Sequence, residues 1–487
     1  MERKTVFLTG ATGNMGGSAL AELLNRRDRF DVVILARPGK KNRKKLAKFS
    51  NIPELKIIWG DLTSYEDVLR GVNGADYVLH VGGMVSPMAD MYPEKTMKVN
   101  VLAAKNIVKA VKAQPDPDRI GVIYIGSVAQ VGNHLPPYHW GRCGDPIYTS
   151  IFDYYSVSKC LAELEFAESG LKKWVSIRQS GMLYADLLKK ANDPIAFHVP
   201  FKGVLEWSTI EDSGRVLANA CEEDVPEEFW RGFYNLSSGD TFRLTNYEFE
   251  KLLLESIHCP KVEKVFEPNW FATRNFHGEW YLDADRLEDM LHFREGVTAQ
   301  EYFERMKKQL PWYFSLAPLA PAFLIKAFMK RLCSTNPLGC LYWVRNNLTE
   351  RINASFGSLE NWKAIPGWDR FDVSRPDDDP RNATLCDHGY DETKPVEELD
   401  INDMKKAAAF RGGECLSETM QKGNLHTPLK WKCQFGHVFG MTPNTILKGG
   451  HWCPECLPEY KSSGNAWNFS EIAKGNPFFA QVFDRDI

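Results

Sequence analysis

Short apolar runs alternate with amphipathic segments through residues 1–180. The runs are rich in Val and Ile, and they comprise Thr5–Leu8, Val32–Ala36, Leu55–Trp59, Tyr77–Val81, Gly121–Ile125 and Trp174–Ile177. Continuous apolar runs of this length are typical of strands that are buried on both faces of a parallel sheet. Residues 94–111 carry apolar side chains at spacings of three and four, as an amphipathic helix does. The alternation predicts an α/β fold with a doubly wound parallel sheet.

A glycine-rich turn follows the first predicted strand. Gly10, Gly13 and Gly16 stand between that strand and a helix-like stretch, residues 18–27. Glycines at these spacings permit a tight turn and a close approach of the backbone to a pyrophosphate, and the free N–H groups of a helix N-terminus attract phosphate. The pattern predicts a dinucleotide site in a Rossmann-type domain. Its expected contacts are Gly10, Thr12, Gly13, Asn14, Met15 and Gly16.

The ends of the following strands supply further candidate cofactor contacts. Arg37 follows the second strand, where an enzyme that prefers NAD usually has an acidic residue for the ribose hydroxyls. A guanidinium there can form a forked contact with the 2′-phosphate of NADP, so Arg37 favours NADP(H) over NAD(H). Asp61 and Leu62 are candidates for contact with the adenine, and Val81 is a candidate for contact with the nicotinamide ribose.

Three residues form a candidate catalytic group. Ser127 follows the fifth predicted strand, and Tyr155 and Lys159 stand four apart in the next helix. Residues four apart share a helical face, so the phenol and the ammonium can point into one cleft. An ammonium and a positively charged nicotinamide both favour the phenolate, and they are expected to bring the pKa of Tyr155 toward neutrality. Ser127 can hold the substrate oxygen while hydride moves.

Together with Asn100, these motifs resemble the extended short-chain dehydrogenase/reductase superfamily across residues 4–310, in the manner of NAD-dependent epimerases/dehydratases or 3β-hydroxysteroid dehydrogenases. The resemblance implies that Tyr155 is the general acid/base and that Lys159 also binds the nicotinamide ribose. It further implies that Asn100 supports a helix kink and a proton relay, and that the protein forms a homodimer. Gln179 departs from the proline that many members have at this point.

Three hypotheses for the reaction follow. Residues 181–310 are expected to form a smaller substrate lobe, and its aromatic, apolar composition favours an NADP(H)-linked oxidoreductase for a bulky, largely apolar alcohol or ketone, 3β-hydroxysteroid-like or acyl-derived. The same residues fit a nucleotide-sugar epimerase or dehydratase with internally recycled cofactor, although the sequence identifies no arginines for its pyrophosphate. A redox-sensing or binding protein on the same scaffold is the third hypothesis, against which the intact Ser127, Tyr155 and Lys159 argue.

Metal-ligand residues cluster near the C-terminus. Cys433, His437, Cys453 and Cys456 have the spacing of a zinc site, and four protein ligands complete a tetrahedral shell, so the zinc is expected to be structural. The segment resembles a zinc-ribbon or treble-clef module, placed at residues 401–487. Cys415 is an alternative ligand, although an ordinary buried thiol is favoured. Docking to the enzyme, dimerisation and binding of nucleic acid or protein remain open as roles of the module.

Composition limits the remaining possibilities. A chain of 487 residues exceeds one compact core, and residues 311–400 are predicted to be a helical extension and linker. The net charge of -3 argues against a general attraction to nucleic acid. The N-terminus has no secretory pattern and the cysteines no disulfide pattern, so the protein is expected to be cytoplasmic. Residues 312–332 are apolar but interrupted by prolines and cations, which predicts a buried helix or a lid over the active site, with a membrane-surface contact as the alternative.

Overall fold

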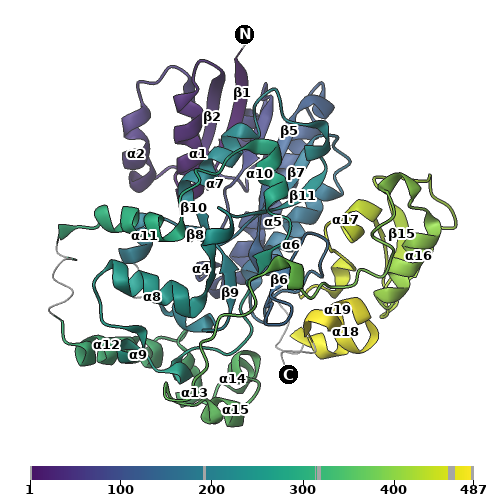
Figure 1. Cartoon of the computed structure of the whole chain (residues 1–487). Coiled ribbons are helices and arrows are strands. Elements are labelled where there is room, and N and C mark those ends of the chain that lie inside the picture. The colour runs from purple at the N-terminus through teal and green to yellow at the C-terminus, as the bar shows by residue number, and fades with distance from the viewer. Residues whose placement is uncertain (1–2, 190–192, 313, 315–319, 459–466, 484–487) are drawn as a thin grey trace.

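The computed structural model describes residues 3–189, 193–312, 314, 320–458 and 467–483 (Figure 1). A seven-stranded parallel sheet has the order β11-β7-β5-β4-β1-β2-β3. The strands are β1 (Lys4–Thr9), β2 (Phe30–Ala36), β3 (Leu55–Trp59), β4 (Tyr77–His80), β5 (Gly121–Ser127), β7 (Trp174–Gln179) and β11 (Gly232–Leu236). The first six coincide with the predicted apolar runs, and the predicted Rossmann-type α/β fold is confirmed. The seventh strand, β11, was not predicted.

Helices cover both faces of the sheet. One face is packed against α1 (Asn14–Asn25), α7 (Ile210–Asn219) and α10 (Asp285–Leu291). The other is packed against α3 (Tyr65–Val72), α5 (Pro93–Lys112) and α6 (Tyr154–Ala167). Helix α5 coincides with the predicted amphipathic helix. Because both faces are covered, the strands are apolar throughout, which is why they read as continuous runs in the sequence.

The strand order reverses beside β1. This strand pairs with β2 on one side and with β4 on the other, so the connections leave its carboxyl end in opposite directions. In open α/β sheets such a point leaves a crevice in which ligands bind. Gly10 and Gly82 approach closely here, since a Cβ atom added to Gly10 would lie 2.8 Å from the Gly82 nitrogen.

The chain after Gly181 alternates between the sheet and a smaller lobe. The lobe contains three two-stranded pairings, made by β6 (Trp140–Gly141) with β13 (Trp280–Tyr281), β8 (Met182–Leu183) with β10 (Ser208–Thr209), and β9 (Val204–Glu206) with β12 (Arg243–Thr245). Its helices include α8 (Asn246–Ser256), α9 (Val262–Val265) and α11 (Ala299–Lys308), whereas the short α2 (Lys40–Leu46) and α4 (Met88–Met91) belong to loops at the sheet.

A helical extension packs onto this lobe. It comprises α12 (Ala322–Thr335), α13 (Cys340–Arg345), α14 (Thr349–Phe356) and α15 (Leu359–Ala364). Phe197 and Phe271 of the lobe share one hydrophobic cluster with Trp343 and Ile352 of the extension. The two segments are therefore held together by a common core, although they are distant in sequence.

Helix α12 corrects one expectation. The apolar segment 312–332, of which residues 313 and 315–319 lie outside the described residues, was expected to be a buried helix or a lid. Where it overlaps α12, Phe323, Leu324 and Phe328 are 68%, 53% and 55% exposed. Only Met329 and Cys333 are buried on this helix, and they face the lobe. Within the described residues, no helix has both the length and the apolar character needed to cross a membrane.

The C-terminal segment forms a small antiparallel sheet with flanking helices. Its elements are α16 (Ile401–Phe410), β14 (Glu414–Cys415), β15 (Leu429–Lys432), β16 (Val438–Met441), α17 (Pro443–Leu447), α18 (Phe469–Gly475) and α19 (Pro477–Phe483). Figure 1 shows α17 beside the β7–β11 edge of the large sheet. Asn444 Nδ2 donates to the Arg231 carbonyl at 2.9 Å, and Thr442 Oγ1 donates to Glu168 at 2.8 Å. The segment is thus docked against the Rossmann-type domain.

Candidate active site and metal centre

The glycine turn has the geometry of a phosphate cradle. Gly10 has a φ of +76°, which favours glycine, and the Gly13 N–H donates to the Gly10 carbonyl at 2.8 Å. A Cβ atom at Gly16 would lie 2.3 Å from the Gly10 oxygen. Gly13 caps α1 without a side chain that could occupy the first N–H groups of the helix. These residues, with Thr12, Asn14 and Met15 between them, fit the diphosphate of a dinucleotide.

The other expected cofactor contacts lie along the same edge of the sheet. Arg37 is exposed directly after β2, and Val81 follows β4, where its N–H donates to Thr9 Oγ1 at 3.1 Å. Asp61 follows β3 and accepts a hydrogen bond from Thr63 Oγ1 at 2.8 Å. The adjacent Leu62 side chain lies against Gly82.

Two cations that the sequence reasoning did not single out flank this edge. Lys45 Nζ donates to the Thr12 carbonyl of the glycine turn at 2.7 Å. The Arg43 guanidinium lies 4.5 Å above the Trp59 ring at the end of β3. Both come from α2, so the basic stretch after Arg37 is partly turned toward the cofactor edge rather than toward solvent alone.

The three candidate catalytic residues meet at the carboxyl edge of β5. Ser127 ends this strand, and Tyr155 and Lys159 lie on successive turns of α6. Lys159 Nζ donates to the Ile125 carbonyl at 2.6 Å and lies 5.9 Å from the centre of the Tyr155 ring. The Ser127 side chain lies close enough to Tyr155 to lower the pKa of the phenol. Helix α6 begins here because Asp153 caps it, accepting from the Ser156 N–H at 2.8 Å.

The electrostatics of this group differ from expectation. Burial raises the pKa of Tyr155 to about 12, and the nearby Ser127 side chain only partly opposes this shift. Burial lowers the pKa of Lys159 to about 8, against the attraction of Glu163. The protein by itself therefore does not lower the pKa of the phenol, because desolvation is the largest influence on it. A bound oxidised nicotinamide would add the positive charge that favours the phenolate.

Asn100 ties three segments together behind the catalytic helix. Its Nδ2 donates to Ser158 Oγ on α6 at 2.8 Å and to the Met84 carbonyl at 3.0 Å. Its Oδ1 accepts from the Met84 N–H at 2.7 Å. The side chain thus connects α5, α6 and the loop after β4, a position that fits the supporting role implied by the resemblance.

A charged group lies beside Tyr155, and the sequence indicated neither its two aspartates nor its arginine. Asp90 Oδ1 accepts from the Tyr155 N–H at 3.2 Å, His277 Nδ1 lies 3.5 Å from Asp153, and the Arg351 guanidinium lies 4.3 Å above the Phe152 ring. Burial, followed by repulsion from Asp153, raises the pKa of Asp90 to about 7, whereas Arg351 opposes the shift. We call these residues the Asp90 cluster, defined as Asp90, Asp153, His277 and Arg351. Arg351 belongs to the distant extension, so no local signal could have found it.

A second missed group lies one turn beyond Lys159. Glu163 is fully buried, and its carboxylate accepts from Arg178 Nη2 at 2.8 Å and from His451 Nε2 at 2.6 Å. Gln130 Nε2 and Ser176 Oγ donate to it at 2.9 Å and 2.5 Å. We call these five residues the Glu163 network. Burial alone would raise the pKa of Glu163, but Arg178 and His451 outweigh it, and the pKa is lowered.

The Glu163 network connects the C-terminal segment to the catalytic residues. The Ser127 N–H donates to Gln130 Oε1 at 2.8 Å, and Gln130 in turn donates to Glu163. On the far side, Arg178 Nη2 donates to the Gly449 carbonyl at 2.6 Å. Residues 449–451 therefore reach the underside of the active site. The spacing of Lys159 and Glu163 marks a shared helical face, but nothing in the sequence marks His451 as their neighbour.

The four predicted metal ligands are brought together. Cys433, His437, Cys453 and Cys456 place their ligand atoms within 4.8 Å of one another. His437 Nδ1 lies 3.4 Å from the Cys433 sulfur and 3.5 Å from the other two, and the Cys433 and Cys456 sulfurs are 3.9 Å apart. A tetrahedral zinc with bonds of about 2.0–2.3 Å needs ligand separations of this size.

The surroundings of this cluster also bear on the metal. Cys415, the alternative ligand, lies outside the group and is buried in the hydrophobic cluster of the segment. The tight hairpin from Cys433 to His437 is closed by the Cys433 N–H, which donates to the His437 carbonyl at 3.0 Å. The donor set of three thiols and one imidazole fits zinc, and it leaves no position for a reacting water.

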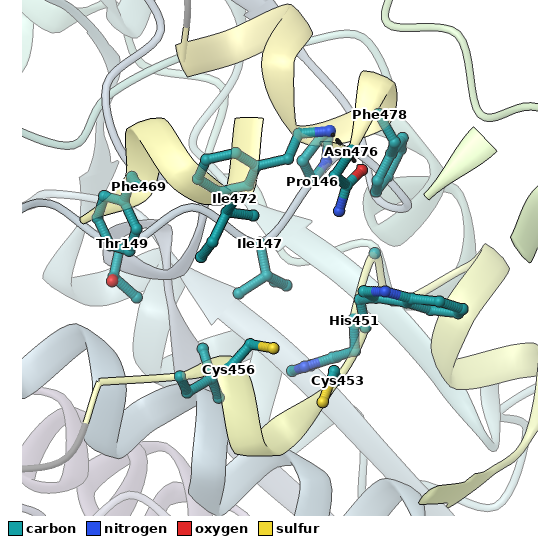
Figure 2. Close-up of a pocket in the computed structure, with 14 residues that line it drawn as sticks. Pro146, Ile147, Thr149, His451, Cys453, Cys456, Phe469, Ile472, Asn476 and Phe478 are labelled. Atoms are coloured by element: carbon teal, nitrogen blue, oxygen red, sulfur yellow. Dashed lines mark hydrogen bonds between the residues drawn. The ribbon is translucent and has the colours of Figure 1, made fainter. Parts of the chain in front are cut away.

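A small cavity separates the cluster from the last two helices. Figure 2 shows His451, Cys453 and Cys456 on one side of it and Ile472 on the other. Its volume of about 60 Å³ admits a few water molecules but no substrate of the expected size. The cavity is therefore a feature of the docking region and not a second active site.

Comparison with known sequences agrees with this geometry. Residues 6–172 match the profile of the NAD dependent epimerase/dehydratase family. Over 111 residues the chain is 32% identical to a UDP-glucose 4-epimerase of Rickettsia massiliae (strain Mtu5), a match that covers 22% of this chain and 32% of the relative. A UDP-glucose 4-epimerase of Rickettsia canadensis (strain McKiel) gives the same values. The chain thus matches about a third of the length of these curated relatives.

Solved structures share the fold. A double mutant of DesIV, a dTDP-glucose 4,6-dehydratase from Streptomyces venezuelae with NAD and DAU bound, superposes with a TM-score of 0.50 at 20% identity, covering 63% of this chain and 96% of that one. A dTDP-glucose 4,6-dehydratase from Bacillus anthracis str. Ames in complex with NAD gives 0.51 at 13% identity, covering 64% and 96%.

The Rossmann-type fold and the family match of residues 6–172 support the short-chain dehydrogenase/reductase superfamily that the motifs predict. Within that class, residues 6–172 match the NAD dependent epimerase/dehydratase family.

Proposed function

We propose that the protein is an NADP(H)-dependent oxidoreductase that transfers hydride between the nicotinamide and a bulky, largely apolar alcohol or ketone. The observation that carries this proposal is the convergence of Ser127, Tyr155 and Lys159 at the edge of β5, beside the glycine turn. A serine, a buried phenol and an ammonium in one cleft are suited to hold a carbonyl or hydroxyl oxygen and to exchange its proton.

Each residue has a defined role in the proposed reaction. Ser127 orients the substrate oxygen by a hydrogen bond. In the oxidation direction, the Tyr155 phenolate removes the hydroxyl proton while the carbinol C–H leaves as hydride, and in the reduction direction the phenol returns that proton. Lys159 binds the nicotinamide ribose and adds positive charge near the phenol. Asn100 holds the helix that carries Tyr155 and Lys159 through its bond to Ser158.

The rim of the site supports an apolar substrate. Val85, Met88, Met91 and Tyr92 are 58%, 50%, 51% and 49% exposed. They lie on or beside α4, the short helix whose Asp90 contacts the Tyr155 N–H. Exposed apolar side chains beside a catalytic residue favour a ligand with a large hydrophobic surface. Such a surface suits a 3β-hydroxysteroid-like or acyl-derived compound.

The proposed preference for NADP(H) rests on the cations at the cofactor edge. Arg37 is exposed after β2, and Lys45 is held against Thr12. Replacing Arg37 by Ala is expected to reduce the ratio of kcat/KM for NADPH over NADH by roughly 10–100-fold, because a charge-assisted contact is lost. Arg119→Ala, at an exposed arginine elsewhere, is the control. An unchanged ratio in Arg37→Ala would contradict the assignment.

A nucleotide-sugar epimerase or dehydratase is the second candidate. It is favoured by the similarity to UDP-glucose 4-epimerases in sequence, and the Asp90 cluster provides polar groups near Tyr155 that a sugar could contact. In this reaction the same tyrosine starts the oxidation, but the cofactor is restored within one turnover. No net change in the nicotinamide would then be observed.

We further propose a structural role for zinc in the C-terminal segment. The four-ligand group supports a closed tetrahedral site, and the contacts of residues 449–451 with the Glu163 network support docking to the enzyme in place of binding to nucleic acid. Structural zinc would fix Cys453, which lies two residues from His451.

The test is a screen that follows nicotinamide absorbance. Purified enzyme receives NADP+ or NADPH with steroid-like, acyl-derived and nucleotide-sugar compounds, and sugar products are analysed separately. Turnover of an apolar alcohol or ketone is expected, with a loss of about 10²–10⁴-fold in Tyr155→Phe. Tyr184→Phe is the matched control. Isomerised or dehydrated sugar without net cofactor change would replace the first candidate by the second.

A further inference from the structure

Helix α12 presents one continuous exposed face. Phe323, Leu324 and Phe328 occupy its N-terminal part, whereas Lys330 and Arg331 are exposed near its C-terminal end. At 100° per residue, these side chains fall within one half of the helix circumference. The opposite half carries Met329 and Cys333, which are buried against the lobe. The helix is therefore anchored on one side and amphipathic on its free side.

The charge of this surface has one sign. Helix α12 contains Lys326, Lys330 and Arg331 and no acidic residue. Lys326 is paired with Glu267, but Lys330 and Arg331 form no ion pair within the described part of the chain. Figure 1 shows α12 at the margin of the molecule next to α9, where the exposed Lys261 and Lys264 are accompanied by the half-buried Glu263. The chain as a whole carries a charge of -3, so this cationic region is local.

We propose that the free face of α12 is a docking surface for an anionic lipid bilayer. A bilayer can contact both the apolar and the cationic side chains of this face, because Phe and Leu enter the acyl boundary while Lys and Arg remain at anionic headgroups. A polyanion such as nucleic acid would leave the three apolar side chains without a partner. A second copy packed on this face would bring Lys330 and Arg331 toward their own symmetry mates.

The arrangement describes attachment and not insertion. Helix α12 has 14 residues, and at 1.5 Å per residue it is shorter than a bilayer core. Its buried half is committed to the hydrophobic cluster with Phe197 and Trp270. The helix can therefore lie in the plane of the interface without leaving the fold. This inference does not depend on the reaction that the enzyme catalyses.

The experiment is sedimentation of the full chain with vesicles. One set contains phosphatidylcholine alone, and the other contains phosphatidylcholine and phosphatidylglycerol in a three-to-one ratio. The wild type is expected to bind the anionic vesicles at least about tenfold more tightly than the neutral ones, and less tightly at high salt. Lys330→Glu with Arg331→Glu, and separately Phe323→Ser with Phe328→Ser, are each expected to weaken binding by at least about tenfold.

Matched controls distinguish this surface from others. Lys405→Glu with Lys406→Glu reverses two exposed charges on α16, and Leu385→Ser with Leu416→Ser removes two exposed apolar side chains elsewhere. Both pairs should bind like the wild type. The proposal is overturned if the wild type binds neither vesicle, if it binds both equally, or if the controls weaken binding as much as the α12 variants. It is also overturned if light scattering finds a dimer that only the α12 variants dissociate.

Discussion

Two charged groups at opposite ends of helix α6 illustrate different uses of buried charge. In the Glu163 network, the carboxylate accepts hydrogen bonds from four different side chains, and its pKa is lowered. In the Asp90 cluster, the buried His277 Nδ1 has no hydrogen-bond partner within the described residues, and the pKa of Asp90 is raised to about 7. Arg178 Nη1 in the first group is likewise buried without a hydrogen-bond partner within the described residues, so the two groups differ in how their carboxylates are paired: Glu163 has four internal donors, whereas Asp90 lies near a second carboxylate, Asp153.

This difference indicates which group is held together by its charges and which contains a carboxyl that titrates near neutral pH. A carboxylate with a full set of internal donors fixes the elements that supply them, here β7, the turn after β5, and residues 449–451. A buried carboxyl beside a second carboxylate, such as Asp90 beside Asp153, favours its protonated form. We therefore expect changes in the Glu163 network to affect folding and changes in the Asp90 cluster to affect pH dependence.

The largest effect is expected from Glu163→Gln. This change leaves the buried Arg178 without its anionic partner, and breaking a buried pair on one side typically costs about 3–5 kcal/mol. The free energy of unfolding, measured with urea, should fall by that amount. Glu165→Gln, a partly exposed neighbour on the same helix, should change it by less than about 0.5 kcal/mol. Equal stabilities of the two variants would show that the network does not hold the fold together.

An intermediate effect is expected from Cys456→Ser. The change removes one of four ligand atoms, so zinc content measured by elemental analysis should drop below about half an ion per chain. The free energy of unfolding should fall by about 2 kcal/mol or more, because the segment that positions His451 loses the metal that holds it. Cys415→Ser, outside the ligand group, should retain the metal. If the metal-free wild type kept its free energy of unfolding, the metal site would not support the Glu163 network.

The smallest effect, with a definite sign, is expected from Asp90→Asn. The folded pKa of about 7 lies above the ordinary value of 3.8, so the fold favours the protonated acid. The stabilisation of the fold that comes from this raised pKa is fully present below pH 3.8 and is lost as the pH rises through 7. The Asn variant cannot ionise, so it should match the wild type at pH 4 and exceed its stability at pH 8 by on the order of 1 kcal/mol.

The control for this prediction is Asp116→Asn, at an exposed site remote from α6. Its difference from the wild type should not vary with pH. If the free energies of unfolding of the wild type and Asp90→Asn changed in parallel with pH, the raised pKa of Asp90 would be contradicted. The contrast between the Asp90 cluster and the Glu163 network would then be lost.

Much of the fold was predictable because its signals are local. Six strands of the large sheet coincide with apolar runs, since each is buried on both faces. Strand β11 was not predicted, because Gly232–Leu236 is short, contains Gly and Asn, and lies in a region expected to be the lobe. Helix α12 was expected to be buried because its composition is apolar, but composition does not reveal which half of a helix has a partner.

The sequence by itself determined the strand pattern, the glycine turn, the Tyr155–Lys159 spacing and the grouping of cysteines with His437. These features depend on residues that are close in the chain or on backbone conformations that few residues permit. Only the tertiary structure decided that His451 meets Glu163, 288 residues away, and that Arg351 lies near enough to Asp90 to affect its pKa. Such contacts depend on how whole elements pack, and a single sequence carries no periodicity that records them.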